Sequence, residues 1–151
     1  MPLQHETDIL DQKEPVLVLG FGLTGKALAQ FFENKEIGYY IYDDRAELKH
    51  EGQCYLGHAT QDNIDEVLDQ CKILIPSPGV PLTHSVVLKA NQKQMPIHGE
   101  LGLASHYLTG KFIAVTGTNG KSTTVKLIDK LLKDAGQSVS LKGNIGMPLI
   151  T

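Results

Sequence analysis

Residues 116–123 constrain the possible folds of this chain more than any other stretch. They read Thr-Gly-Thr-Asn-Gly-Lys-Ser-Thr and lie between a short apolar run and a segment of helical periodicity. The run 112–115 is rich in branched side chains, as is typical of a strand buried on both faces. Behind the turn, Val125, Ile128 and Leu132 recur at helical spacing. The pattern predicts a strand, a glycine turn and a helix, an arrangement that cradles phosphate groups.

The residue types in this turn suit a triphosphate. Gly117 and Gly120 let the backbone approach a ligand without a Cβ in the way. Lys121 can reach the β- and γ-phosphates, and the Ser122 hydroxyl can ligate Mg²⁺. The first glycine of the pattern G-x-x-x-x-G-K-[ST] is replaced by Val115. The alternative is therefore an ordinary strand-to-helix turn with a surface lysine.

Composition favours a folded protein and disfavours several partners. Apolar residues make up 41% of the 151 positions, and 14 Lys and Arg against 17 Asp and Glu give a net charge of -3. The chain thus has no excess of positive charge, which nucleic-acid-binding domains usually have. No signal peptide and no apolar run of membrane-spanning length is recognisable, so we expect a cytoplasmic protein without membrane insertion. Cys54 and Cys71 are isolated in sequence, which favours reduced thiols over a disulfide or zinc site.

A second glycine motif lies near the start of the chain. After the apolar run 15–19, residues 20–25 read Gly-Phe-Gly-Leu-Thr-Gly, a complete G-x-G-x-x-G. A helix and a second strand at 39–42 are expected next, and Asp43 follows at the offset of a ribose-binding acid. The order predicts nucleotide binding, with close backbone approach to a phosphate at Gly22. The alternative is a glycine-rich turn that serves only the packing of the helix on the strand and binds no nucleotide.

The remaining periodicities predict a Rossmann-like parallel α/β sheet in a domain spanning residues 1–108. The pattern then restarts, and residues 109–151 are expected to begin a P-loop ATPase-type central domain. A further strand is predicted at 138–141, but two strands and one helix cannot bury both faces of a sheet. We therefore expect this chain to be a fragment of a longer protein. Helices are also predicted over residues 62–70, 85–94 and 100–107, and strands over 72–75 and 95–97.

Four motifs in this order resemble the beginning of the Mur ligases, and among them the branch that adds D-glutamate. They are residues 20–25, the triplet Asp43-Asp44-Arg45, the turn Ser77-Pro78-Gly79, and residues 116–123 followed by Gly-Asn-Ile-Gly at 143–146. Valine at position 115 is also the form found in that family. The resemblance covers nearly the whole chain from Val16 onward.

The resemblance implies cytoplasmic peptidoglycan synthesis by a monomeric, ATP- and Mg²⁺-dependent ligase, and hence a role in cell wall formation, cell shape and cell division. ATP would phosphorylate the carboxylate of UDP-N-acetylmuramoyl-L-alanine, and the amine of D-glutamate would displace the phosphate. Lys121 would stabilise the transferring phosphoryl group as the catalytic residue, with Ser122 on magnesium. The resemblance assigns ATP to Gly117, Thr118, Asn119, Gly120, Lys121, Ser122 and Thr123. It assigns the UDP-sugar substrate to Gly22, Leu23, Thr24, Asp43, Asp44, Arg45, Ser77, Gly79 and Asn144.

Several alternatives remain at the level of sequence. One is a NAD-binding Rossmann protein, against which the magnesium-ATP turn and Arg45 argue. Another is a nucleotide-sensing regulatory module, and others are a sister Mur ligase or a relative of the folylpolyglutamate synthetases. By itself the chain is expected to lack ligase activity, to bind UDP-sugar weakly and to have little affinity for ATP. His58, His84 and His98 are expected to be solvated or capping and receive no role.

Overall fold

The structure, a computed structural model, describes residue 10 and residues 14–45, 48–107, 111–143 and 147–151. Its contacts divide the chain into a larger unit, Met1–Tyr107 with Ile150–Thr151, and a smaller unit, Leu108–Leu149. Asn144, one of the expected substrate residues, lies outside the described residues. No helix in the described part of the chain meets the length and apolarity that a membrane crossing requires.

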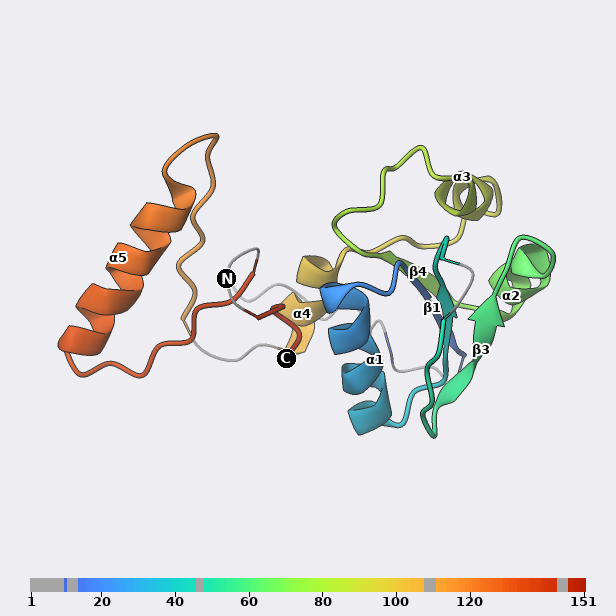
Figure 1. The fold of residues 1–151 in the computed structure, drawn as a ribbon, viewed down its shortest axis with the longest axis horizontal. Helices are drawn as coiled ribbons and strands as arrows, with labels where there is room; N and C mark the ends of the chain where they lie inside the picture. The colour runs from blue at the N-terminus through green and yellow to red at the C-terminus, as the bar shows by residue number, and fades with distance from the viewer. Residues whose placement is uncertain (1–9, 11–13, 46–47, 108–110, 144–146) are drawn as a thin grey trace, which may run out of the picture. The chain divides into compact units, whose positions relative to one another are not determined.

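A parallel four-stranded sheet forms the centre of the larger unit (Figure 1). The central strand β1 is fully buried, as its unbroken apolar sequence predicts for a strand covered on both faces. Leu19 pairs with Tyr42 on one side and with Pro76 on the other, so three strands end at the same edge of the sheet. The strands, in the spatial order β3-β2-β1-β4, are β1 Val16–Leu19, β2 Tyr39–Tyr42, β3 Tyr55–Ala59 and β4 Ile73–Pro76.

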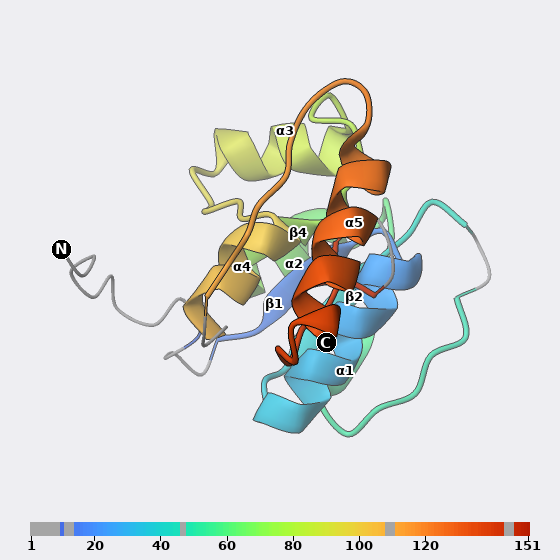
Figure 2. The same cartoon turned by 90° about the vertical axis from the view of Figure 1, so that its left-hand side faces the viewer.

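Helices cover both faces of this sheet, which confirms the predicted Rossmann-like α/β fold. Leu17 and Leu19 of β1 belong to a buried cluster with residues of α2 and α3, whereas Phe32 of α1 contacts the ring of Tyr39 from the opposite face. Figures 1 and 2 show α4 beside α1, where Phe31 meets Tyr107. The helices are α1 Leu23–Lys35, α2 Ile64–Gln70, α3 Ser85–Gln92 and α4 Glu100–Tyr107.

The larger unit differs from the sequence prediction in three details. Strand β3 was not predicted, because its sequence Tyr-Leu-Gly-His-Ala is short, contains a glycine and lies at the edge of the sheet. The expected strand at 95–97 reduces to one bridge between Leu74 and Ile97. The periodicity of the helix predicted over residues 85–94 puts Val86, Val87 and Leu88 on its inner face, but Leu88 is 49% exposed.

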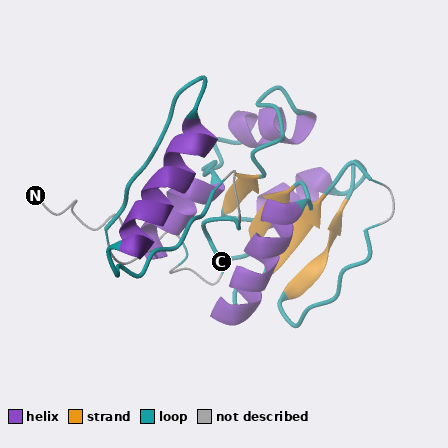
Figure 3. Ribbon diagram, turned by 60° about the vertical axis from the view of Figure 1, so that its left-hand side comes forward, coloured by secondary structure: helices purple, strands orange, loops and turns teal. Residues whose placement is uncertain are grey.

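In the smaller unit the predicted helix forms but the predicted strands do not. Helix α5, Lys121–Asp134, begins directly after the turn. Residues 112–115 and 138–141 have no strand geometry and are drawn as loop in Figure 3. A parallel strand needs neighbours for its backbone hydrogen bonds, and the described residues of this unit offer only a bridge between Lys142 and Met147. Phe112 and Ile113 are accordingly exposed.

Candidate nucleotide-binding site

The turn between β1 and α1 is tight, and two of its positions require glycine. Gly20 has φ +89°, and its N–H donates to the carbonyl of Tyr42 at 2.7 Å. A Cβ on Gly25 would lie 2.1 Å from the Gly20 carbonyl oxygen. The first and third glycines of the motif therefore let α1 start close against the end of β1, as the sequence predicts.

The N-terminus of α1 opens onto free space. Gly22 is its N-cap, no side chain caps the first turn, and that turn contains no acidic residue. A Cβ added to Gly22 would meet no heavy atom within 4 Å. The first amides of a helix lack intrahelical acceptors and carry the positive end of its dipole. The turn formed by Gly22, Leu23 and Thr24 is thus suited to an anion such as a phosphate.

Asp43, at the end of β2, clamps this turn. Its Oδ2 accepts a hydrogen bond from the Phe21 backbone N–H at 2.6 Å and from Arg45 Nη2 at 2.8 Å. Its Oδ1 accepts from Arg45 Nε at 2.6 Å and from the Arg45 backbone N–H at 3.0 Å. The Arg45 side chain, followed by the two backbone donors, holds the pKa of Asp43 well below its usual range. The carboxylate predicted to bind a ribose is engaged by the protein itself.

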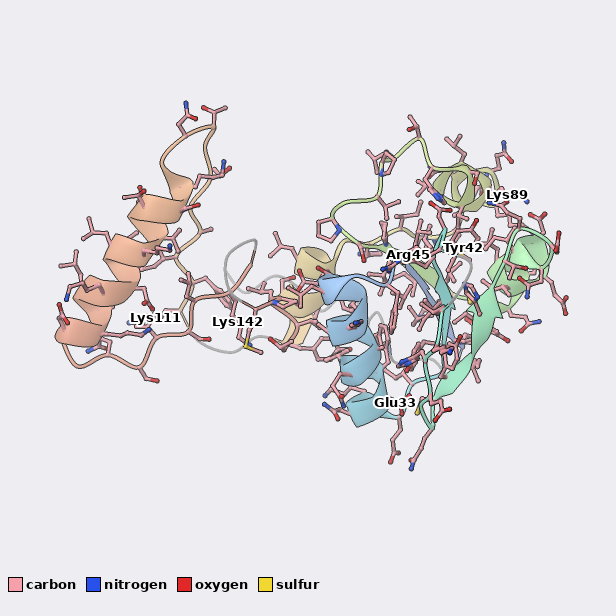
Figure 4. The ribbon with its side chains drawn as sticks, viewed as in Figure 1. Glu33, Tyr42, Arg45, Lys89, Lys111 and Lys142 are labelled. Atoms are coloured by element: carbon pink, nitrogen blue, oxygen red, sulfur yellow. The ribbon has the colours of Figure 1, made fainter. Side chains whose placement is uncertain are left out.

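Arg45 completes the clamp from the solvent side. Its Nη2 also donates to the Phe21 carbonyl at 3.1 Å, although 67% of its side chain is exposed. Figure 4 shows Arg45 beside the first turn of α1. The guanidinium therefore contributes a positive charge next to the free amides of that turn.

The loop after β4 supplies the other border of the site. The backbone N–H of Ser77 donates to Leu19 O, and its Oγ donates to Gly20 O, both at 2.8 Å. A Cβ added to Gly79 would meet no heavy atom within 4 Å, so this glycine faces open space. The structure thus brings together the turn 20–25, the triplet 43–45 and Ser77 with Gly79, as expected for the carboxyl edge of a parallel sheet.

A partly buried polar network lies next to Phe21, and no sequence motif predicts it. Tyr39 Oη donates to Glu33 Oε1 at 2.9 Å and lies 2.7 Å from His50 Nε2. The His50 ring packs edge-on against Phe21, with centroids 4.8 Å apart. Burial and the neighbouring Glu33 raise the pKa of Tyr39, and burial lowers the pKa of His50. No motif marks these residues, because three separate elements contribute them.

The second candidate site is the loop that leads into α5. Gly117 and Gly120 have φ values of +146° and +76°, conformations that favour glycine. Lys121 is the first residue of α5, and its Nζ donates back to the Gly117 carbonyl. The first turn of α5 has no acidic residue, and Ser122 and Thr123 are exposed. Glycines, hydroxyls and one lysine without carboxylates form a donor set that fits a magnesium-bound polyphosphate.

No other metal site is evident in the part of the chain that the structure describes. Those residues contain no group of three or more His, Cys, Asp or Glu side chains close enough to share a metal ion. Cys54 and Cys71 are both free thiols.

Comparison with known proteins gives a consistent result. Residues 14–99 match the family described as "Mur ligase MurD-like, N-terminal domain". The chain is 37% identical over 150 residues to a UDP-N-acetylmuramoylalanine--D-glutamate ligase of Syntrophus aciditrophicus, covering 95% of this chain and 33% of that protein. It is 37% identical over 142 residues to the ligase of the same name from Caldicellulosiruptor bescii, covering 89% and 31%. The chain therefore spans about a third of the length of these curated relatives.

Proposed function

Because the chain belongs to the Mur ligase family, in its MurD-like branch, we propose that it is part of an ATP-dependent ligase that adds D-glutamate to UDP-N-acetylmuramoyl-L-alanine in peptidoglycan synthesis. Relatives that bear the name of this ligase, and that align with 89 to 95% of the chain, support the proposal. We further propose that the protein is monomeric and acts in the cytoplasm, as the resemblance to the Mur ligases implies.

The larger unit would bind the UDP part of the substrate. The observation that carries this assignment is the uncapped first turn of α1, which opens to free space beside the Arg45 guanidinium. We assign the diphosphate to the amides of Gly22, Leu23 and Thr24. The uridine would lie along the triplet 43–45. Ser77, Gly79 and Asn144 would line the rest of the substrate.

Residues 109–151 would be the first part of the central ATP-binding domain. ATP supplies the phosphoryl group that activates the substrate carboxylate. Gly117, Thr118, Asn119, Gly120 and Thr123 would surround its phosphates, Lys121 would stabilise the charge of the transferring group, and Ser122 would ligate Mg²⁺. Because residues 112–115 have no strand partner among the residues that the structure describes, we expect the 151-residue chain to bind ATP weakly and to have no ligase activity.

Titration of the ¹⁵N-labelled chain with UDP and with NADH tests the proposal, because NMR detects weak binding and maps it to residues. We expect UDP to shift the amide signals of residues 21–25 and 43–45, and NADH to leave them in place. Gly22→Val, which adds a side chain where there is open space, should abolish the UDP shifts without unfolding the chain. Gly102→Ala, at an open position in α4, is the matched control. Shifts with NADH alone would instead favour a dinucleotide-binding protein.

A further inference from the structure

His84 connects the two loops that border the nucleotide turn. It lies after β4 and directly before α3, while Asp44 follows β2. Strand β1 lies between β2 and β4 in the sheet, so a contact between these loops passes over the end of β1. His84 Nε2 is 3.2 Å from Asp44 Oδ2 and 3.3 Å from Asp44 Oδ1. The pair therefore bridges two loops at the edge of the sheet where the β1–α1 turn lies.

The orientation of the His84 ring is fixed by its other contacts. Nδ1 accepts a hydrogen bond from the Val86 backbone N–H at 3.2 Å, which caps α3. A nitrogen that accepts carries no proton, so the proton of the neutral ring lies on Nε2 and is donated to Asp44. The ring also packs edge-on against Tyr42, with centroids 5.7 Å apart, and its side chain is only 13% exposed.

The two neighbouring aspartates differ in what they can offer a ligand. Asp43 accepts four hydrogen bonds from Phe21 and Arg45. Asp44 is 71% exposed; the single Nε2 of His84 lies close to both of its oxygens, and the Tyr42 hydroxyl is its other polar neighbour. Each carboxylate oxygen has two lone pairs, so these two donors leave acceptor capacity on the exposed carboxylate. Of the two aspartates, Asp44 is therefore the one that can accept a hydrogen bond from a ligand. It directly follows Asp43, which holds the β1–α1 turn.

We propose that His84 is a positioning residue that holds the Asp44 carboxylate to accept a hydrogen bond from the imide N–H of a uracil ring, so that the pair selects uridine over cytidine nucleotides. This inference rests on the proposed binding of UDP. Uracil presents an N–H at N3, whereas cytosine presents a lone pair there. An ionised carboxylate can only accept. A site built to accept from a ligand N–H discriminates strongly against a ligand that lacks it.

The test compares the dissociation constants of UDP and CDP, measured by NMR titration of the 151-residue chain and its variants. We expect the wild-type chain to prefer UDP by about 10-fold or more. Asp44→Asn presents an amide that both donates and accepts, so the preference should fall to about threefold or less. His84→Asn retains a side chain that caps α3 but is too short to reach Asp44. It should weaken UDP binding several-fold and leave CDP binding nearly unchanged.

Two controls separate positioning from stability. Both His84→Asn and His84→Ala lose the ring contact with Tyr42, but only His84→Ala also loses the cap, so its thermal midpoint should be the lower of the two. Lys89 of α3 forms a 2.7 Å ion pair with Asp65 of α2, away from the nucleotide turn. Lys89→Ala breaks this ion pair and should leave the affinities for UDP and CDP unchanged. Figure 4 labels Lys89 on α3 and Arg45 beside α1.

Three results would overturn the inference. An unchanged UDP to CDP ratio in both His84→Asn and Asp44→Asn would remove the pair from base selection while leaving UDP binding intact. An equal loss of UDP and CDP affinity in His84→Asn would reduce His84 to a structural role. A wild-type chain that binds no UDP at all would refute the proposed function, and this inference with it.

Discussion

Replacing Asp43 by Asn tests the clamp that holds the nucleotide turn. The substitution conserves shape but exchanges a carboxylate oxygen for an amide NH₂ group. In the wild-type chain both oxygens accept hydrogen bonds, from Phe21 N–H and from three donors of Arg45. Either orientation of the asparagine directs its NH₂ group at another donor. The loss thus includes at least one unpaired N–H at a side chain that is 9% exposed.

The magnitude follows from the contact with Phe21. A hydrogen bond to a charged group contributes about 1.5–3 kcal/mol to stability. The contacts with the exposed Arg45 side chain are screened by solvent and add little. We therefore expect Asp43→Asn to lower the free energy of unfolding by about 2 kcal/mol. For a unit of this size, that loss corresponds to a drop of about 8–16 °C in the thermal midpoint.

The effect should depend on pH with a definite sign. Arg45 and the Phe21 amide lower the pKa of Asp43 in the folded state. A carboxyl group with a lowered folded pKa stabilises the protein at pH values above its unfolded pKa of about 3.9. This contribution declines as the pH falls below that value and is lost once the pH passes below the folded pKa. The difference between wild type and Asp43→Asn should be constant near neutral pH and should narrow in acid.

Urea denaturation followed by circular dichroism at pH 7, 4 and 3 would measure these free energies. Asp69→Asn, at a carboxylate that is 68% exposed, is a control for the loss of one surface charge and should change stability by less than about 0.5 kcal/mol. A variant Asp43→Asn as stable as the wild type at pH 7, or a difference that persists unchanged in acid, would refute the clamp.

Three further predictions concern other parts of the chain. Gly25→Ala should destabilise the larger unit by about 1–3 kcal/mol in urea denaturation, because its Cβ would lie 2.1 Å from the Gly20 carbonyl oxygen; unchanged stability would show that this packing is looser. Burial raises the pKa of the Cys71 thiol to about 12, so at pH 8 a disulfide reagent should modify it about a hundredfold more slowly in the folded than in the urea-unfolded chain, and equal rates would contradict its burial. In a full-length ligase that carries this sequence, Lys121→Ala should lower kcat for phosphate release about a hundredfold or more without changing the thermal midpoint, whereas a regulatory module would retain turnover.

The sequence predicted the larger unit well where one local pattern decides the structure. The glycines at 20 and 25 are required by a positive φ and by a close backbone approach, and both constraints act within a few residues. Strand β1 was predictable because burial on both faces leaves a continuous apolar run. Strand β3 was missed because an edge strand needs no such run.

The smaller unit shows the opposite case. Residues 112–115 have the composition of a buried strand, but residues 112–114 are exposed and the segment lacks strand geometry. Helix α5 forms nonetheless, because its hydrogen bonds are local. Composition indicates which residues favour a strand, but strand formation also requires neighbouring strands in the same unit.

The sequence alone determined the glycine turns, the central strand β1, the helices that follow the turns and the family, because these depend on contacts between residues close in the chain or on motifs at fixed spacing. Only the tertiary structure decided which partners the residues at the carboxyl ends of the strands bind. It bonds Asp43 to Phe21, 22 positions away, and His84 to Asp44, 40 positions away. The reason is that parallel strands bring the loops at their carboxyl ends together in space, whatever the length of chain between them.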